Sequence, residues 1–234
     1  MNMIASTTLK LMRTNWILVM VALPVLFGLF LYWYLGRYDN LDQVFYSYTL
    51  YFNCLLPCVI ALMISLYTQY EEQIGHFNHL LQLPRRDKWL LNMIVFTWLS
   101  VGISTLLNSV PLWLLVGSSY NVYILYYLLL TTLFSLPVII ILWFVALKIN
   151  VGICLGAGVF FGVFFMSFGA NILGDEMWMY VPLLYGTRYF SEIMMPNEHS
   201  LLPLVICMFL LCSGFLLAVV TYWFKRWEGR IINE

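Results

Sequence analysis

The sequence predicts an all-α integral membrane protein with six transmembrane helices and both termini in the cytosol. Of the 234 residues, 63% are hydrophobic and 9% are charged, whereas a soluble domain is about half apolar and about a quarter charged. The mean hydropathy of the chain is +0.88. Apolar runs long enough to cross a bilayer follow one another, and the basic residues are concentrated in every second connection between them. Together these observations define the fold class.

A transmembrane helix needs about 20 mainly apolar residues. The stretches that meet this requirement are residues 16–35, 44–69, 89–117, 122–147, 151–170 and 201–224. They take up most of the sequence. We therefore expect residues 1–234 to form one transmembrane domain, with no room for a soluble enzyme domain.

The positive charges predict how the spans are oriented. With the N-terminus in the cytosol, the outer connections hold only Arg37 and Arg188. The rest of the 11 basic residues fall on the inner side: Lys10, Arg13, Arg85, Arg86, Lys88, Lys148, Lys225, Arg226 and Arg230. Because Lys and Arg in short loops stay on the cytosolic side, both termini are predicted to be cytosolic. An odd number of spans would break the alternation, so the charges also favour six crossings.

Residues 71–88 (EEQIGHFNHLLQLPRRDK) stand out because they place charges between two long apolar runs. Ile74, Phe77 and Leu81 recur at helical spacing with Leu80 beside them, which is the pattern of an amphipathic helix. Pro84 lacks a backbone N–H and would end that helix. The segment predicts a short helix on the cytosolic membrane surface, between the second and third spans and available to a partner.

Two other segments are expected at the membrane interfaces. Residues 2–13 (NMIASTTLKLMR) predict an interfacial helix leading into the first span, and a frayed end with two basic residues is the alternative. Residues 171–200 combine acidic, aromatic and proline residues, which favours short helices lying in or dipping into the outer interface. Their acidic groups would attract a cationic peptide. The positive-inside rule alone also leaves acidic residues on the outer side.

Glycines mark one face of the fifth span. Gly152 and Gly156, and likewise Gly158 and Gly162, are spaced so that another helix can approach closely. A helix of the same chain or of a second subunit could occupy this face. The pattern slightly favours a second subunit.

Motifs of enzymatic chemistry are missing from the sequence. It has no G-x-x-x-x-G-K-[ST] loop to hold the phosphates of ATP, no G-x-S-x-G elbow and no H-E-x-x-H pair. Charges within the spans are scarce, which disfavours an ion-coupled carrier. We predict no catalytic, cofactor-binding or metal-binding residues and no disulfide framework for Cys54, Cys58, Cys154, Cys207 and Cys212.

One enzyme class remains as an alternative. Glu71 and Glu72, followed by His76 and His79, resemble the EExxxR pattern of the glutamate-pair intramembrane proteases. Position 76 is His rather than Arg. The third histidine, His199, is predicted on the opposite side of the membrane. These departures favour a protein that is not an enzyme.

The chain as a whole resembles the ABC-2-type transporter permeases. That family has six spans with cytosolic ends, a leading amphipathic helix, a cytosolic coupling helix between the second and third spans, and an outer dipping segment before the last span. Its coupling segment carries a Glu, a Gly-Thr, a Leu-Leu, a Pro and a basic residue. The matching residues here are Glu71 or Glu72, Gly75, Leu80 and Leu81, Pro84 and Arg85, with His76 in place of the Thr.

The resemblance implies one permease domain over residues 1–234 and an ATP-driven exporter in which a cytosolic ABC ATPase, not this chain, binds ATP and Mg²⁺. It also implies a second permease, identical or related. The opening LKLMRTNW and the chain length are similar to permeases of lantibiotic self-immunity and bacitracin resistance, which implies expulsion of a cationic bacteriocin from a bacterial plasma membrane. A stand-alone peptide-binding immunity protein is the alternative, and no nucleic-acid partner is expected. We expect the ATPase-coupling residues to be Glu71, Glu72, Ile74, Gly75, Phe77, Leu80, Leu81, Pro84 and Arg85.

Overall fold

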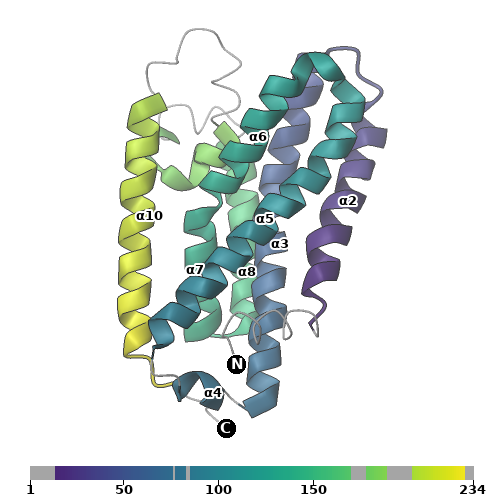
Figure 1. Ribbon diagram of the computed structural model, residues 1–234. Helices are drawn as coiled ribbons and strands as arrows, with labels where there is room; N and C mark the ends of the chain where they lie inside the picture. Colours follow the sequence, from purple (N-terminus) through teal and green to yellow (C-terminus); the bar gives the residue numbers. More distant parts are fainter. Residues whose placement is uncertain (1–13, 76, 83–84, 170–177, 189–201, 230–234) are drawn as a thin grey trace.

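The computed structural model describes residues 14–75, 77–82, 85–169, 178–188 and 202–229, and all regular elements within these ranges are helical (Figure 1). The helices long and apolar enough to cross a membrane are Trp16–Leu35, Leu41–Gly75, Arg86–Val116, Ser118–Lys148, Val151–Gly169 and Leu204–Lys225. The predicted set of six spans is thereby confirmed for the described residues. The chain is a multi-pass membrane protein. The helix predicted over residues 2–13 lies outside the described residues.

Three spans are single uninterrupted helices, and a fourth continues well past its predicted end. The single helices are α2 (Trp16–Leu35), α5 (Arg86–Val116) and α10 (Leu202–Lys225). The longer one is α3 (Leu41–Gly75), which exceeds the predicted residues 44–69 because residues 70–74 are compatible with a helix and contain no glycine or proline. The short helix α4 (Asn78–Leu81) joins α3 to α5.

The remaining spans are interrupted. In the fourth span, the turn η1 (Ser118–Tyr120) and α6 (Asn121–Phe134) are followed by α7 (Leu136–Lys148), and Pro137 in its first turn cannot donate a helical hydrogen bond. In the fifth span, α8 (Val151–Phe164) ends in the π-helical turn η2 (Phe165–Gly169). Of the expected outer segment, residues 178–188 are described and include the turns η4 (Trp178–Tyr180) and η5 (Pro182–Leu184).

Helix α3 is the centre of the bundle. It packs against α2, α5, α7 and α8. Within the apolar window of each span, 72% of the α3 residues are buried, compared with 17% for the span containing α8. Most of the surface of α8 therefore faces outward, toward lipid or another chain.

One glycine pair of α8 packs against α3. A Cβ atom added to Gly158 would lie 2.9 Å from the carbonyl oxygen of Pro57, and one added to Gly162 would lie 2.6 Å from that of Cys54. No side chain fits at either distance, so these glycines serve contact within the chain. The slight preference for a second subunit is wrong for this pair. Gly156 has no described neighbour within 4 Å of its added Cβ.

A buried polar network holds four helices together at Asn108 of α5. The Asn108 amide donates from Nδ2 to the carbonyl oxygen of Pro24 in α2 at 3.0 Å. The Tyr48 hydroxyl of α3 donates to the Asn108 carbonyl oxygen at 2.8 Å, and the Tyr127 hydroxyl of α6 donates to Oδ1 at 3.2 Å. Gly28 of α2 leaves room for this network, because its added Cβ would lie 2.8 Å from the Tyr48 hydroxyl.

The described basic residues are sorted between the two ends of the bundle as the sequence predicts. In Figure 1, α4 lies at the same end as the start of α5 and the finish of α10. That end carries Arg85 and Arg226, whereas Arg37 lies at the other end, between α2 and α3. The Arg226 guanidinium stacks on Tyr222 at 4.6 Å and that of Arg37 on Trp33 at 4.5 Å. We call the end with α4 the basic end.

Candidate functional site

The junction between α3 and α5 is the segment that the sequence singles out, and its course differs from the prediction. Residues 71–75 form the last turn of α3 rather than part of a separate surface helix. Phe77 then takes a φ of 64°, which turns the chain away from the α3 axis, and α4 supplies only four residues. The expected amphipathic helix is therefore replaced by an extended α3, a sharp turn and one helical turn.

The two glutamates of the segment lie in different environments. Glu71 is 3% exposed, and the Tyr67 hydroxyl one turn earlier on α3 donates a hydrogen bond to its Oε1 at 2.8 Å. Glu72 is half-buried. The sequence predicted that both carboxylates contact a partner; in the structure Glu71 is buried within the protein, whereas part of the Glu72 side chain is accessible.

The apolar residues in and just before α4 pack inward, partly against residues 227–229. Phe77 is 3% exposed and Leu80 is 1% exposed. The Phe77 ring meets the Trp227 ring edge-on, with 5.5 Å between centroids. A Cβ added to Gly229 would lie 3.4 Å from Cδ1 of Leu81, so residues 227–229 also contact that residue. Phe77 and Leu80 thus anchor the junction within the protein instead of offering an apolar face to a partner.

Arg86 connects the three elements that meet here. From the first turn of α5, its Nη1 donates to the carbonyl oxygen of Trp227 at 2.7 Å and its Nη2 donates to that of Leu81 at 2.6 Å. Hydrogen bonds from a guanidinium are charge-assisted and directional. The side chain therefore fixes α4 and residues 227–229 relative to α5.

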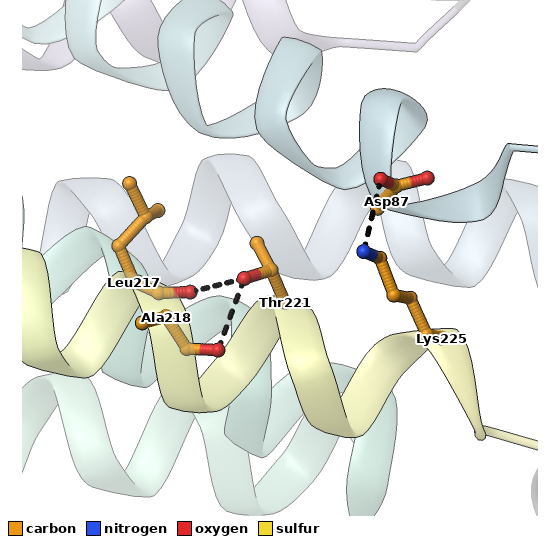
Figure 2. Close-up of polar contacts among 5 residues, drawn as sticks. All are labelled: Asp87, Leu217, Ala218, Thr221 and Lys225. Carbon is orange, nitrogen blue, oxygen red and sulfur yellow. Dashed lines mark hydrogen bonds and ion pairs between the residues drawn. The ribbon is translucent and has the colours of Figure 1, made fainter.

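A second link between α5 and α10 lies at the surface (Figure 2). Lys225 Nζ is 3.6 Å from Asp87 Oδ2. The Lys225 side chain is 59% exposed, so this pair contributes at most about 1 kcal/mol. One turn earlier on α10, Thr221 Oγ1 contacts the carbonyl oxygens of Leu217 at 2.6 Å and Ala218 at 3.1 Å. This bond satisfies the hydroxyl within its own helix.

Several side chains of the junction remain accessible. Ile74 is 60% exposed at the last turn of α3, which is unusual for an apolar residue next to charged ones. Gly75 beside it is half-buried, and no described atom of another residue lies within 4 Å of its added Cβ. Pro84 and the side chain of His79 lie outside the described residues. The exposed residues that surround Ile74 along the segment are Gln73, Asn78, Gln82 and Arg85.

An aromatic cluster links the junction to the helices above it. From Trp227, the contacts run through Phe224 (5.2 Å between centroids) to Trp89 of α5 (5.7 Å). Trp89 meets Trp143 of α7 at 6.0 Å and Tyr67 of α3 at 6.2 Å. Such pairs add to the energy of burial and restrict relative motion. We call these five residues the aromatic cluster.

Sequence reasoning did not single out Tyr67, Arg86 or Trp227 as site residues. The only sequence signal for Trp227 is a tryptophan among charged residues just after the last span. Arg86 was used only as one of the basic residues that predict the orientation of the spans. Nothing in the sequence showed that its side chain would reach from α5 to residue 227.

Within the described residues, no group of three or more His, Cys, Asp and Glu side chains is placed to hold a metal ion. Cys54, Cys58, Cys154, Cys207 and Cys212 are all described, and none forms a disulfide. The junction connects two long helices and leaves a few side chains exposed at the tip of α3.

The described residues form a helical multi-pass membrane protein with six helices long and apolar enough to cross a bilayer. Comparison with models of known protein families, with curated proteins and with solved structures finds no match to this chain.

Proposed function

We propose that this chain is the permease subunit of an ATP-driven ABC exporter in a bacterial plasma membrane, with the basic end in the cytosol. The observation that carries the proposal is the junction at that end. It joins the long helices α3 and α5 through α4 and exposes Ile74 and its polar neighbours at the tip of α3. A partner that binds there gains direct mechanical access to both helices.

The partner would be a cytosolic ABC ATPase that holds ATP and Mg²⁺. Ile74 would insert into a groove of the ATPase, and Glu72 and Arg85 would form polar contacts at its edge. Phe77 and Leu80 would act from within, because they bind α4 to the rest of the basic end. This division of roles replaces the sequence-based expectation that Phe77 itself enters the ATPase.

Movement of the ATPase would reach the spans through contacts already described. Arg86 ties α4 to α5 and to residue 227, so a displacement of α4 moves α5 and the end of α10 together. The aromatic cluster then connects these helices to α3 and α7. Packed side chains of this kind favour displacement of helices as bodies. The outer end would open by rearrangement of those same helices.

A second permease would pair along the side where α2, α3 and α8 border an open apolar cavity of about 460 Å³. The exposed residues Val159 and Val163 of α8 line this side, and Gly156 has no described neighbour near it. The cargo would be a cationic lantibiotic or bacteriocin peptide, expelled from the membrane for self-immunity. The acidic and aromatic composition of residues 171–200 supports this cargo.

Site-specific crosslinking tests the proposal. A photoreactive amino acid at position 74 should crosslink an ATP-binding subunit in membranes of the source cell, and the Ile74→Asp variant of the purified complex should lose ATP-dependent peptide export. The matched control places the photoreactive group at Leu211, which is 66% exposed on α10. Crosslinks to the same ATPase from both positions, or a reporter at position 80 found outside the cell, would contradict the proposal. So would full peptide protection by the chain expressed without an ATPase.

A further inference from the structure

Four segments meet at one place in the bundle. They are the turn of α3 that contains Pro57, the break at Ser135 between α6 and α7, the π-helical turn η2, and residues 186–187 after η5. Each contributes to the wall of one small cavity of about 20 Å³, which is lined on its polar side by Asn53, Thr131, Ser135 and Thr187. Irregular backbone at membrane depth is tolerated where it is enclosed by protein or lines a hydrated space.

Thr131 is the most informative residue of this cavity. Its side chain lines the cavity and is 2% exposed, yet its Oγ1 has no hydrogen-bond partner among the described residues. A hydroxyl buried without a partner costs about 1–3 kcal/mol. Most threonines in the spans avoid that cost by donating to a carbonyl one turn earlier, as Thr97 donates to Met93 at 2.8 Å. Thr131 does not.

Oxygen atoms that can accept a further hydrogen bond line the same cavity. The Asn53 amide donates from Nδ2 to the carbonyl oxygen of Gly186 at 2.7 Å, and this is the one hydrogen bond that its side chain forms within the described residues, so Oδ1 is left as an acceptor. Pro57 has no N–H to offer the carbonyl oxygen of Asn53 four residues earlier. Thr187 Oγ1 donates to the carbonyl oxygen of Leu184 at 2.9 Å and retains its own lone pairs.

We propose that this cavity binds one water molecule. The space is larger than the roughly 10–15 Å³ that a single water requires, and a buried water needs two to four polar partners. The water would accept a hydrogen bond from Thr131 Oγ1 and donate one to Asn53 Oδ1, and its second proton would go to either the Asn53 carbonyl oxygen or Thr187 Oγ1. It would connect α3, α6 and the segment after η5. The cavity, about 20 Å³ in volume, fits a single water molecule.

Hydroxyl-radical footprinting of the purified protein in detergent tests this site. Radicals formed by radiolysis of a bound water modify the side chains beside it, whereas dry buried side chains stay unmodified. Phe134 and Phe165 line the cavity. Phe52 is the matched control, because it is fully buried on α3 and does not line the cavity. We expect modification of Phe134 and Phe165 and none of Phe52.

Two substitutions test the role of the hydroxyl. In Thr131→Val, which has nearly the same shape, labelling of Phe134 and Phe165 should fall to the level of Phe52. In Thr131→Ser, which keeps the hydroxyl, labelling should persist. Labelling of the wild-type cavity no higher than that of Phe52, or equal labelling in the valine variant, would overturn the proposal. The wild-type measurement decides the matter even if a variant fails to fold.

Discussion

Arg86 donates a 2.7 Å hydrogen bond to the carbonyl oxygen of Trp227, across 141 positions of the sequence. The same guanidinium donates to the carbonyl oxygen of Leu81. A single side chain thus joins the first turn of α5 to the residues that follow α10 and to the last residue of α4. These hydrogen bonds hold the three elements to one another at the basic end.

Replacing Arg86 with methionine should weaken the contacts between α4, the start of α5 and the residues that follow α10. Hydrogen bonds to charged groups contribute about 1.5–3 kcal/mol each, and Arg86→Met removes two of them while keeping much of the side-chain volume. We expect a lower midpoint of thermal unfolding in detergent and faster tryptic cleavage after Arg226. Arg85→Met is the control, because Arg85 is exposed. Equal effects of the two substitutions would contradict the role assigned to Arg86.

The hydroxyl of Tyr67 should matter for stability. In Tyr67→Phe the buried Glu71 carboxylate loses a donor at 2.8 Å, and loss of a partner by a buried polar group costs about 1–3 kcal/mol. Tyr70→Phe makes the same chemical change on the same helix, at a half-buried position with no described hydrogen bond from its hydroxyl. Chemical denaturation should therefore separate the two variants. Indistinguishable unfolding curves would show that Glu71 does not depend on Tyr67.

Phe77 and Ile74 should give opposite phenotypes. Phe77→Ala removes a buried ring from the contact with Trp227, and such changes cost about 3–5 kcal/mol. Ile74→Ala truncates a side chain that is 60% exposed, so the free energy of unfolding should change by less than about 0.5 kcal/mol.

Among variants that fold, the effect on ATP-dependent export should be the reverse of the effect on stability, with Ile74→Ala the more harmful substitution. ATP-dependent export should fall in Ile74→Ala even though that variant is as stable as the wild type. Export at the wild-type rate in Ile74→Ala, measured as peptide resistance of the producing cells, would remove Ile74 from the coupling contact.

Replacing the glycines of α8 with alanine should change the stability by amounts that depend on the position. Gly158→Ala places a methyl group 2.9 Å from the Pro57 carbonyl oxygen, and Gly162→Ala places one 2.6 Å from that of Cys54. Both variants should lose about 1–3 kcal/mol through overpacking. Gly156→Ala meets no described atom within 4 Å and should be neutral or slightly stabilising in detergent. If Gly156→Ala instead disrupts a dimer seen by crosslinking, that result locates the second permease on this face.

The sequence predicts the spans well because the length of an apolar run is a direct physical requirement of the bilayer. The contacts of Asn108 with other helices follow from a similar requirement, because an amide in lipid needs hydrogen-bond partners. The end of α3 was placed too early, since charged residues such as Glu71 ended the predicted span although they remain helical. Hydropathy marks where a helix leaves the lipid, not where it ends.

The candidate site was predicted only in outline. The charged residues and the proline predicted its location between the second and third spans. They did not predict which of its side chains are buried. Phe77 shows why: its left-handed backbone breaks the helical phase from which an apolar face was inferred. The partner of that ring, Trp227, comes from the far end of the chain, and local patterns carry no information about such a contact.

Helix α3 has 35 residues and is therefore about 52 Å long, against a hydrocarbon thickness of about 30 Å. A helix of this length has to project beyond the acyl chains, to tilt across them, or both. Pro57 lies close to its midpoint, where the missing backbone N–H weakens the helix. A bend at that point would let the half that ends at Ile74 change its direction while the half that begins at Leu41 keeps its own.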